Sequence, residues 1–389
     1  MGFDISNHPV DVALIKQRII PFIRGGGEDR LNDLVARAAT LNCIKYRANS
    51  WALGLKEYDM AMWHRQRELR ITRTVRVHQP QGIVDRVLSR PPAFKDVTID
   101  QVTGIPGFDS DLSVWGRPFF IVADTTEEAL EALHSYLTLP DAAPGTVDAV
   151  AMRMLAKLDA RRDRPPQGFD ASVLQVLLDS YPLAERVIPH QQGKPPDEGD
   201  MAKWLRRRFD LARTVFADRD TDAVVEGDDG EIVPAAELAE VLAHEVINLA
   251  AQTLPGWMGR GHVWPTALFR RIGVRASGIF ERPVSLFEDL LHDLPDIGRN
   301  LHSTIVENYC LGGYVPPQKM EAFVDLLTKH RRELILAGHQ GKEGTADLDQ
   351  LPGMADFIKI FEPAVYALRH GYGFIEAAEI YSVILGPMN

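Results

Sequence analysis

Two segments in the second half of the sequence each carry a glutamate four residues before a histidine. They are Glu240 with His244, in AELAEVLAHEVINLA, and Glu288 with His292, in SLFEDLLHDL. Side chains four residues apart lie one above the other on the same face of an α-helix. Each pair would present a carboxylate and an imidazole to one point, and these ligands suit zinc, manganese or iron. The sequence thus predicts a divalent-metal site formed by Glu240, His244, Glu288 and His292.

Further carboxylates that would complete such a site are Glu307, Glu376 and Glu379. The same spacing has a second interpretation, in which each Glu–His pair only stabilises its own helix by a few tenths of a kcal/mol. The zinc-protease helix motif is incomplete, because its second histidine would fall at position 248, where the sequence has Asn248.

Two histidines outside the expected helices have glycine neighbours. His262 lies in GRGHVW and His370 lies in RHGYG. Glycine allows a ligand to approach the backbone closely, so both histidines are candidates for lining a pocket. The alternative is that each one hydrogen-bonds the backbone of its own turn.

Composition sets limits on the kind of protein. The chain has 389 residues, of which 45% are hydrophobic and 25% charged, and its formal net charge is −11 with a pI near 5.6. An acidic balance argues against nucleic acid as a partner and fits attraction to a basic protein. No apolar run approaches the ~18 residues of a membrane span, so no membrane association is expected.

The cysteines and the first residues predict a location. Cys43 and Cys310 are the only two cysteines and lie far apart in sequence, which gives no disulfide framework and fits a reducing compartment. The start of the sequence lacks a charged segment followed by an apolar stretch, as a signal peptide would have. We therefore expect a soluble cytoplasmic protein.

Periodicity and turn residues predict an α+β fold that is rich in helix, with several short strands in the N-terminal half and a mostly helical C-terminal half. A first strand over residues 2–7 should end at His8-Pro9. The segment AVVEGDDGEIV predicts a tight hairpin with its turn at Asp229-Gly230. Residues 296–309 are expected to be helical, and residues 312–317, GGYVPP, are expected to form a rigid turn.

The link HQQGKPPDEG is the best candidate for a domain boundary, because it is polar and rich in proline and glycine. It divides the chain into an N-terminal α+β region, residues 1–190, and a C-terminal helix-rich region, residues 200–389.

These observations leave two hypotheses about function. The acidic charge and the lack of a complete catalytic motif favour a soluble intracellular protein-binding protein of an immunity-like or regulatory kind. The alternative is a metal-dependent enzyme, oxidative or hydrolytic, that uses the helix-borne Glu and His ligands.

Overall fold

The computed structural model describes residues 4–27, 30–46, 74–78, 88, 94–98, 197–217, 224–226, 232–254, 258–260, 263–276, 278–338 and 352–380. The chain divides into two compact units. The first unit joins residues 1–46 and 114–117 to residues 192–389, and the second contains the remaining residues, 47–113 and 118–191. Within the second unit, β2 (Thr74–His78) pairs with β3 (Phe94–Thr98) as an antiparallel hairpin.

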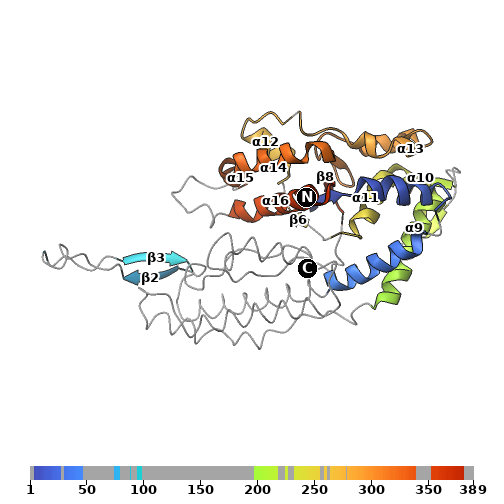
Figure 1. Ribbon diagram of the computed structural model, residues 1–389, viewed down its shortest axis with the longest axis horizontal. Helices are drawn as coiled ribbons and strands as arrows, with labels where there is room; N and C mark the ends of the chain where they lie inside the picture. Colours follow the sequence, from blue (N-terminus) through green and yellow to red (C-terminus); the bar gives the residue numbers. More distant parts are fainter. Residues whose placement is uncertain are drawn as a thin grey trace. The chain divides into compact units, whose positions relative to one another are not determined.

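The first unit is α+β and helix-rich, as predicted (Figure 1). Its elements in chain order are β1 (Asp4–Val10), α1 (Val12–Leu14), the π-helix η1 (Ile15–Ile19), α2 (Ile20–Ile23), a helical segment over residues 30–46, α9 (Glu198–Ala217), β4 (Val224–Glu226), β5 (Ile232–Pro234), α10 (Ala235–Glu240), α11 (Leu242–Ala251), β6 (Met258–Arg260), α12 (Pro265–Arg271), the 3-10 helix η4 (Pro283–Leu286), α13 (Glu288–Leu291), the 3-10 helix η5 (Pro295–Asn300), β7 (Leu311–Val315), the 3-10 helix η6 (Pro317–Lys319), α14 (Met320–Lys329), α15 (Arg331–Gly338), α16 (Pro352–His370) and β8 (Gly373–Ala378).

A four-stranded antiparallel sheet organises this unit. Its strand order is β6-β1-β8-β7, so the first strand of the chain and the last described strand are the two central ones. In the β1–β8 ladder, Asn7 lies opposite Glu376 and His8 lies opposite Ile375. Because successive residues of a strand point to opposite faces, Glu376 and His8 project from opposite faces of the sheet.

Helices cover both faces of the sheet. On one face, α11, α9 and the segment around η1 and α2 form a core that includes Phe209, Val246 and Ile375. On the other face, α12, α14, α15 and α16 form a core around Phe323, Phe374 and Ile360. Both faces of the central strands are therefore buried, and every residue of β8 is buried.

The first strand is longer than the sequence predicted. It does not end at His8-Pro9 but continues to Val10. Its neighbour β6 pairs only with residues 4–6, so beyond Ser6 one edge of β1 has no strand partner among the residues described. A proline can occupy such an edge without removing a ladder hydrogen bond. The pairing with β8 also brings β1 into the same compact unit as residues 192–389, and the expected boundary at residues 190–200 stays a prediction.

Two expectations for residues 296–317 were wrong. The helix ends at Asn300, residues 302–310 form a loop, and the supposed rigid turn contains strand β7. The paired glycines have a packing role there. A Cβ on Gly312 would lie 2.7 Å from Oε1 of Glu376, and one on Gly313 would lie 2.7 Å from the side chain of Thr266. Glycine is present because the strand backbone passes close to buried side chains.

The strand pairing of the predicted hairpin is confirmed, since β4 pairs with β5, while its turn at Asp229-Gly230 lies outside the described residues. Among the described residues, no helix combines the length and the apolar character needed to cross a membrane.

Candidate functional site

The predicted Glu240–His244 pair does not share a helix face. Helix α10 ends at Glu240, Val241 departs from helical geometry with φ −103° and ψ 10°, and α11 begins at Leu242. Glu240 is exposed, 3.9 Å from the guanidinium of Arg299. His244 is buried instead, at 5% exposure. The break in the helix separates the two side chains that the spacing had joined.

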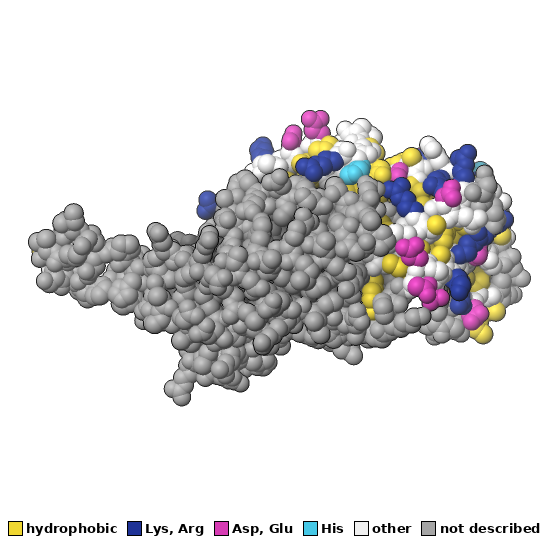
Figure 2. Space-filling model, turned by 60° about the horizontal axis from the view of Figure 1, so that its bottom comes forward, with side chains coloured by type: hydrophobic (Ala, Val, Ile, Leu, Met, Phe, Trp, Pro, Cys, Tyr) yellow, Lys and Arg dark blue, Asp and Glu magenta, His cyan; other side chains and the backbone are white. Residues whose placement is uncertain are grey.

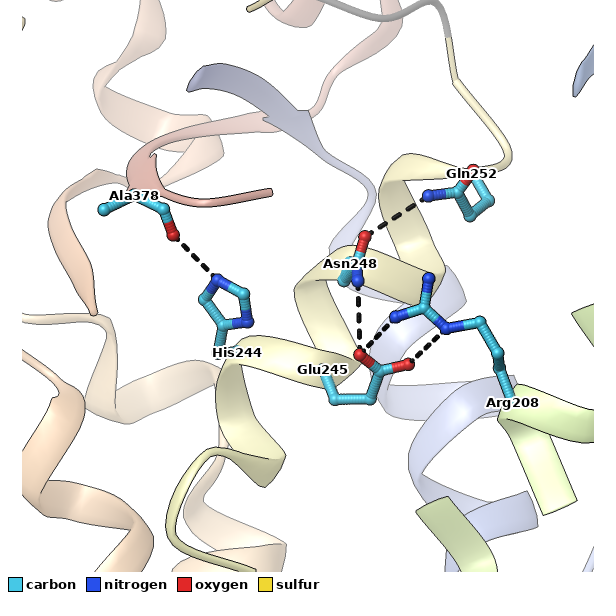
Figure 3. Close-up of polar contacts among 6 residues, drawn as sticks. All are labelled: Arg208, His244, Glu245, Asn248, Gln252 and Ala378. Carbon is cyan, nitrogen blue, oxygen red and sulfur yellow. Dashed lines mark hydrogen bonds and ion pairs between the residues drawn. The ribbon is translucent and has the colours of Figure 1, made fainter. Parts of the chain in front are cut away.

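His244 connects α11 to the sheet. Its Nε2 lies 2.8 Å from the carbonyl oxygen of Ala378, so this nitrogen carries the proton and donates it (Figure 3). Burial lowers the pKa of His244, although the hydrogen bond to Ala378 acts in the opposite direction. The imidazole is therefore neutral and works as a donor to the end of β8.

The next residue on α11 faces a different neighbour. Glu245 binds Arg208 of α9 through two hydrogen bonds of 3.1 and 2.6 Å, and Asn248 and Gln252 extend this network along the helix (Figure 3). A carboxylate with a two-point guanidinium partner is a structural tie and has little capacity left for a metal ion. The network fixes α11, and with it His244, against α9.

Glu288 and His292, the other predicted pair, are both exposed, at the two ends of the short helix α13. Within the described part of the chain, no group of three or more His, Cys, Asp or Glu side chains is arranged to hold a metal ion. The structure thus does not bring Glu240, His244, Glu288 and His292 together there as one ligand set.

The two pocket candidates have different outcomes. His262 lies outside the described residues. His370 is exposed at the end of α16, where its ring stacks on Tyr366 at 4.0 Å and its Nδ1 lies 2.8 Å from the carbonyl oxygen of Tyr366. His370 therefore has the helix-end role of the alternative interpretation.

A fully buried carboxylate lies in the middle of the sheet. Glu376 of β8 is 0% exposed and accepts hydrogen bonds from the hydroxyl of Thr266 at 2.6 Å, from the N–H of Thr266 at 3.1 Å and from the N–H of Gly313 at 2.9 Å, and a further one from the backbone of Ile305. Burial raises the pKa of Glu376 to about 7, while these donors restrain the rise. Glu376 ties together β8, β7 and the start of α12.

The same network extends from Glu376 to the loop over residues 302–310. Thr304 lies 2.5 Å from Thr266, hydroxyl to hydroxyl, and its oxygen accepts the indole N–H of Trp264 at 2.9 Å. Since the Thr266 hydroxyl donates to Glu376, the Thr304 hydroxyl donates to Thr266. This directional chain holds the first half of the loop against the buried carboxylate.

The loop ends in an exposed tip. Val306, Glu307, Asn308 and Tyr309 are four consecutive exposed residues, bounded by the buried residues Ile305 and Cys310. Two of the four are large and apolar, with Val306 at 51% and Tyr309 at 54% exposure. The base is closed by the hydrogen bond from the N–H of His302 to the carbonyl of Leu311, at 2.8 Å. The tip is thus a short segment held at both ends.

Tyr309 has a costly backbone conformation. Its φ is +56°, in the left-handed region, and its ring meets His244 edge-on with the centroids 5.7 Å apart. Glu379, which follows the hydrogen-bonded Ala378, has a φ of +61°. A residue other than glycine in this region costs of order 1 kcal/mol or more, and such residues concentrate at functional sites. Both strained residues are close to His244: Tyr309 carries the ring that His244 contacts, and Glu379 follows Ala378, whose carbonyl His244 binds.

A second buried polar group, His8, lies on the face of the sheet opposite Glu376. His8 is 1% exposed, and neither ring nitrogen has a hydrogen-bond partner among the described residues. Burial, together with the charges of Lys45 and His244, lowers the pKa of His8 to about 3. Lys45 donates to the carbonyl oxygen of Ala251, at 3.1 Å, and burial lowers its pKa as well.

The three carboxylates that the sequence proposed as extra metal ligands are all found around this loop, in other roles. Glu307 is in the tip and lies 3.3 Å from His302, Glu376 anchors the loop from the sheet, and Glu379 receives a 3.4 Å hydrogen bond from the N–H of Asp4.

The sequence missed Thr304, Thr266 and Trp264. Their signal would have been the need of a glutamate within a buried strand for donors from other segments, which spacing along the chain does not reveal.

Comparison with models of known families, with curated proteins and with solved structures finds no match. The site is therefore defined by its geometry alone. What that geometry provides is a strained, exposed, partly apolar tip on a rigid base, which suits recognition of another molecule.

Proposed function

We propose that this chain is a protein-binding protein of an immunity-like or regulatory kind, and that it contacts its partner through the loop tip formed by residues 306–309. The observation that carries the proposal is the exposure of Val306 and Tyr309, at 51% and 54%, on a segment whose two ends are buried. Tyrosine is among the residues that contribute most to binding energy when a partner covers them.

The rigid base supports this proposal energetically. A loop that must be ordered on binding loses conformational entropy, and that loss weakens the complex. Here Ile305 and Cys310 are buried in one apolar cluster with Ile5 and Ala378, and the Thr304 hydroxyl is fixed by Trp264 and Thr266. The tip is thus ordered before a partner arrives.

The chemistry of the tip indicates the kind of partner. Val306 and the ring of Tyr309 offer apolar contact, and Glu307 adds a carboxylate that is 57% exposed. The net charge of −11 attracts a basic partner over longer distances. We therefore expect a protein surface with an apolar depression bordered by lysine or arginine.

A protein partner also fits the surface better than a nucleic acid does. On the face in Figure 2, basic and acidic side chains intermingle over the described residues and do not form a stripe of one sign. Phosphate backbones are bound by continuous basic stripes. Cys43 and Cys310 form no disulfide, which agrees with a reducing compartment, and we propose a cytoplasmic location.

Co-purification from the native cells tests the proposal. The tagged chain is compared with a double variant, Val306→Ser with Tyr309→Ser, and with a matched double variant, Val224→Ser with Ile232→Ser. Val224 and Ile232 are 62% and 68% exposed on the β4–β5 hairpin, so this variant removes similar apolar surface elsewhere.

We expect one or more partners that are retained by the wild-type chain and the hairpin variant and lost, by at least tenfold, from the tip variant. A partner that binds all three equally would place the contact elsewhere. A wild-type chain that retains nothing above background at cellular concentrations would argue against a protein-binding function.

A further inference from the structure

His244 contacts the loop tip from the inside of the protein. Its ring is edge-on to Tyr309, and its Nε2–H donates to the carbonyl of Ala378. The N–H of Ala378 in turn donates to the carbonyl of Cys310, the residue after Tyr309, at 3.1 Å. Ala378 therefore joins the histidine on one side to the end of the loop on the other.

The environment of His244 disfavours protonation of its imidazole to the charged form. Lys45 and His8 are buried basic groups on the same side of the sheet, and His8 is close enough to interact electrostatically with both His244 and Lys45. Arg208 opposes protonation of His244 from α9, while Glu245 of α11 and Glu379 after β8 favour it. Glu245 is already bound in two hydrogen bonds to Arg208.

We infer that His244 is an acid-sensitive latch for the loop over residues 302–310: the loop is closed while this imidazole is neutral, and proton uptake by His244 favours an open loop. The inference rests on the proposed function for its consequence, which is release of the partner on acidification. The opening itself is a property of the chain alone.

The direction follows from proton linkage. In the closed form burial lowers the pKa of His244, whereas in an open, hydrated form the imidazole regains its ordinary value near 6.5. Only the open form then binds the proton between these two values. The open population accordingly rises as pH falls below about 6.5, by about tenfold per pH unit for one such group.

Two other ionisable side chains belong to the loop or contact it, and their effects must be separated from that of His244. His302 lies in the loop itself, 3.3 Å from Glu307, with its side chain 30% exposed. Glu376 contacts the loop directly through the backbone of Ile305 and indirectly through Thr266 and Thr304, and its proton uptake at acid pH favours the folded form, against the direction expected for His244.

Cys310 provides a direct measure of opening. Its residue is 0% exposed, and its thiol accepts hydrogen bonds from the backbone of Val306 and Glu307, so a reagent reaches the sulfur only when the loop opens. The experiment uses the full chain with Cys43→Ser, so that Cys310 is the only thiol. The rate of reaction with dithiodipyridine is measured from pH 7.5 to 5.0 and divided at each pH by the rate for the urea-unfolded chain.

We expect the normalised rate to rise about fivefold from pH 6.5 to 5.5, because half of the open form is already protonated at pH 6.5. His244→Gln keeps a donor for the Ala378 carbonyl but cannot titrate, so this variant should flatten the profile to less than a twofold change. The matched control is His302→Gln, which removes a histidine of the same loop and should leave this rise unchanged.

Three results would overturn the inference: a flat wild-type profile, an unchanged rise in His244→Gln, or loss of the rise in His302→Gln. If His244→Gln does not fold, a flat wild-type profile or loss of the rise in His302→Gln still overturns the inference. Because no partner enters this measurement, a latch that works alongside a failed co-purification would refute the proposed function alone.

Discussion

The two faces of the central sheet each bury an ionisable side chain, but only one of these side chains has hydrogen-bond partners among the described residues. Glu376 accepts hydrogen bonds from Thr266 and Gly313, whereas neither nitrogen of His8 has a hydrogen-bond partner among the described residues. Glu376 therefore holds three segments together, and its pKa rises only to about 7. His8 contributes no such tie, and its pKa falls to about 3. Both side chains are fully buried. The number of hydrogen-bond partners therefore decides whether the buried group stabilises the fold or destabilises it.

The largest effect is expected from removing the anchor. Glu376→Ala leaves the N–H groups of Thr266 and Gly313 without their acceptor and creates a cavity, which together should lower the free energy of unfolding by about 4 kcal/mol. Urea unfolding measures this loss. The exposed Glu288 is the control, since Glu288→Ala should cost less than ~1 kcal/mol. A loss below 1 kcal/mol for Glu376→Ala would show that the carboxylate does not anchor the loop.

A side chain added next to Glu376 should lower the free energy of unfolding by a smaller amount. In Gly312→Ala, the new Cβ would meet Oε1 and Cγ of Glu376 at 2.7 and 2.8 Å. We expect a loss of about 3 kcal/mol, because none of these neighbours is free to move away. The matched variant is Gly278→Ala, whose Cβ meets nothing within 4 Å and which should change stability by less than ~1 kcal/mol. Equal losses in the two variants would contradict the close packing at β7.

The two faces also predict opposite dependences of stability on pH. Glu376 binds a proton more tightly in the folded than in the unfolded chain, so its contribution is complete below about pH 4.5 and is lost as pH rises to about 7. His8 binds a proton more tightly in the unfolded chain, so its contribution is complete above pH 6.5 and is lost as pH falls towards 3. Between pH 4.5 and 6.5 the two trends oppose each other.

Single variants should separate these trends. Relative to wild type, His8→Gln should become more stable by about 2 kcal/mol when the pH is lowered from 7 to 5, because the acid penalty of His8 is removed. Glu376→Gln should change in the opposite direction over the same interval. Both follow from urea unfolding at pH 5 and pH 7. Differences from wild type with the same sign in the two variants would refute the contrast between the faces.

The smallest effect on stability is expected at the loop tip. Tyr309→Gly relieves the cost of a left-handed backbone but removes the edge-on contact with His244, and these changes should nearly cancel, to within ~1 kcal/mol. Thermal unfolding measures the sum. A loss above 2 kcal/mol would mean that Tyr309 is part of the fold and not an exposed residue presented by it.

Periodicity predicted those parts of the molecule whose structure depends on near neighbours. The hairpin of β4 and β5 follows from its turn residues, and the helix-rich α+β character follows from apolar spacing. The same reasoning failed over residues 301–317, where a helix was predicted to continue to residue 309 and the glycines and prolines of residues 312–317 were interpreted as turn signals. Gly312 and Gly313 are present because Glu376 and Thr266 lie against them, and both come from segments distant in sequence.

The Glu–His spacing shows a similar limit. A spacing of four predicts a shared face only within an uninterrupted helix, and Val241 breaks that helix between Glu240 and His244. The sequence also singled out Glu307, Glu376 and Glu379 as metal ligands, whereas in the structure they lie around the loop over residues 302–310 with other partners. Which of them is buried, exposed or hydrogen-bonded depends on partners in other segments.

By itself, the sequence determined the fold class and the net acidic charge, because each depends on composition or on residues close along the chain. Only the tertiary structure decided that the first and last described strands pair and that Glu376 receives donors from Thr266 and Gly313. It alone placed His244 under Tyr309. The physical reason is that burial and hydrogen bonding are set by contacts across hundreds of residues, which no local pattern encodes.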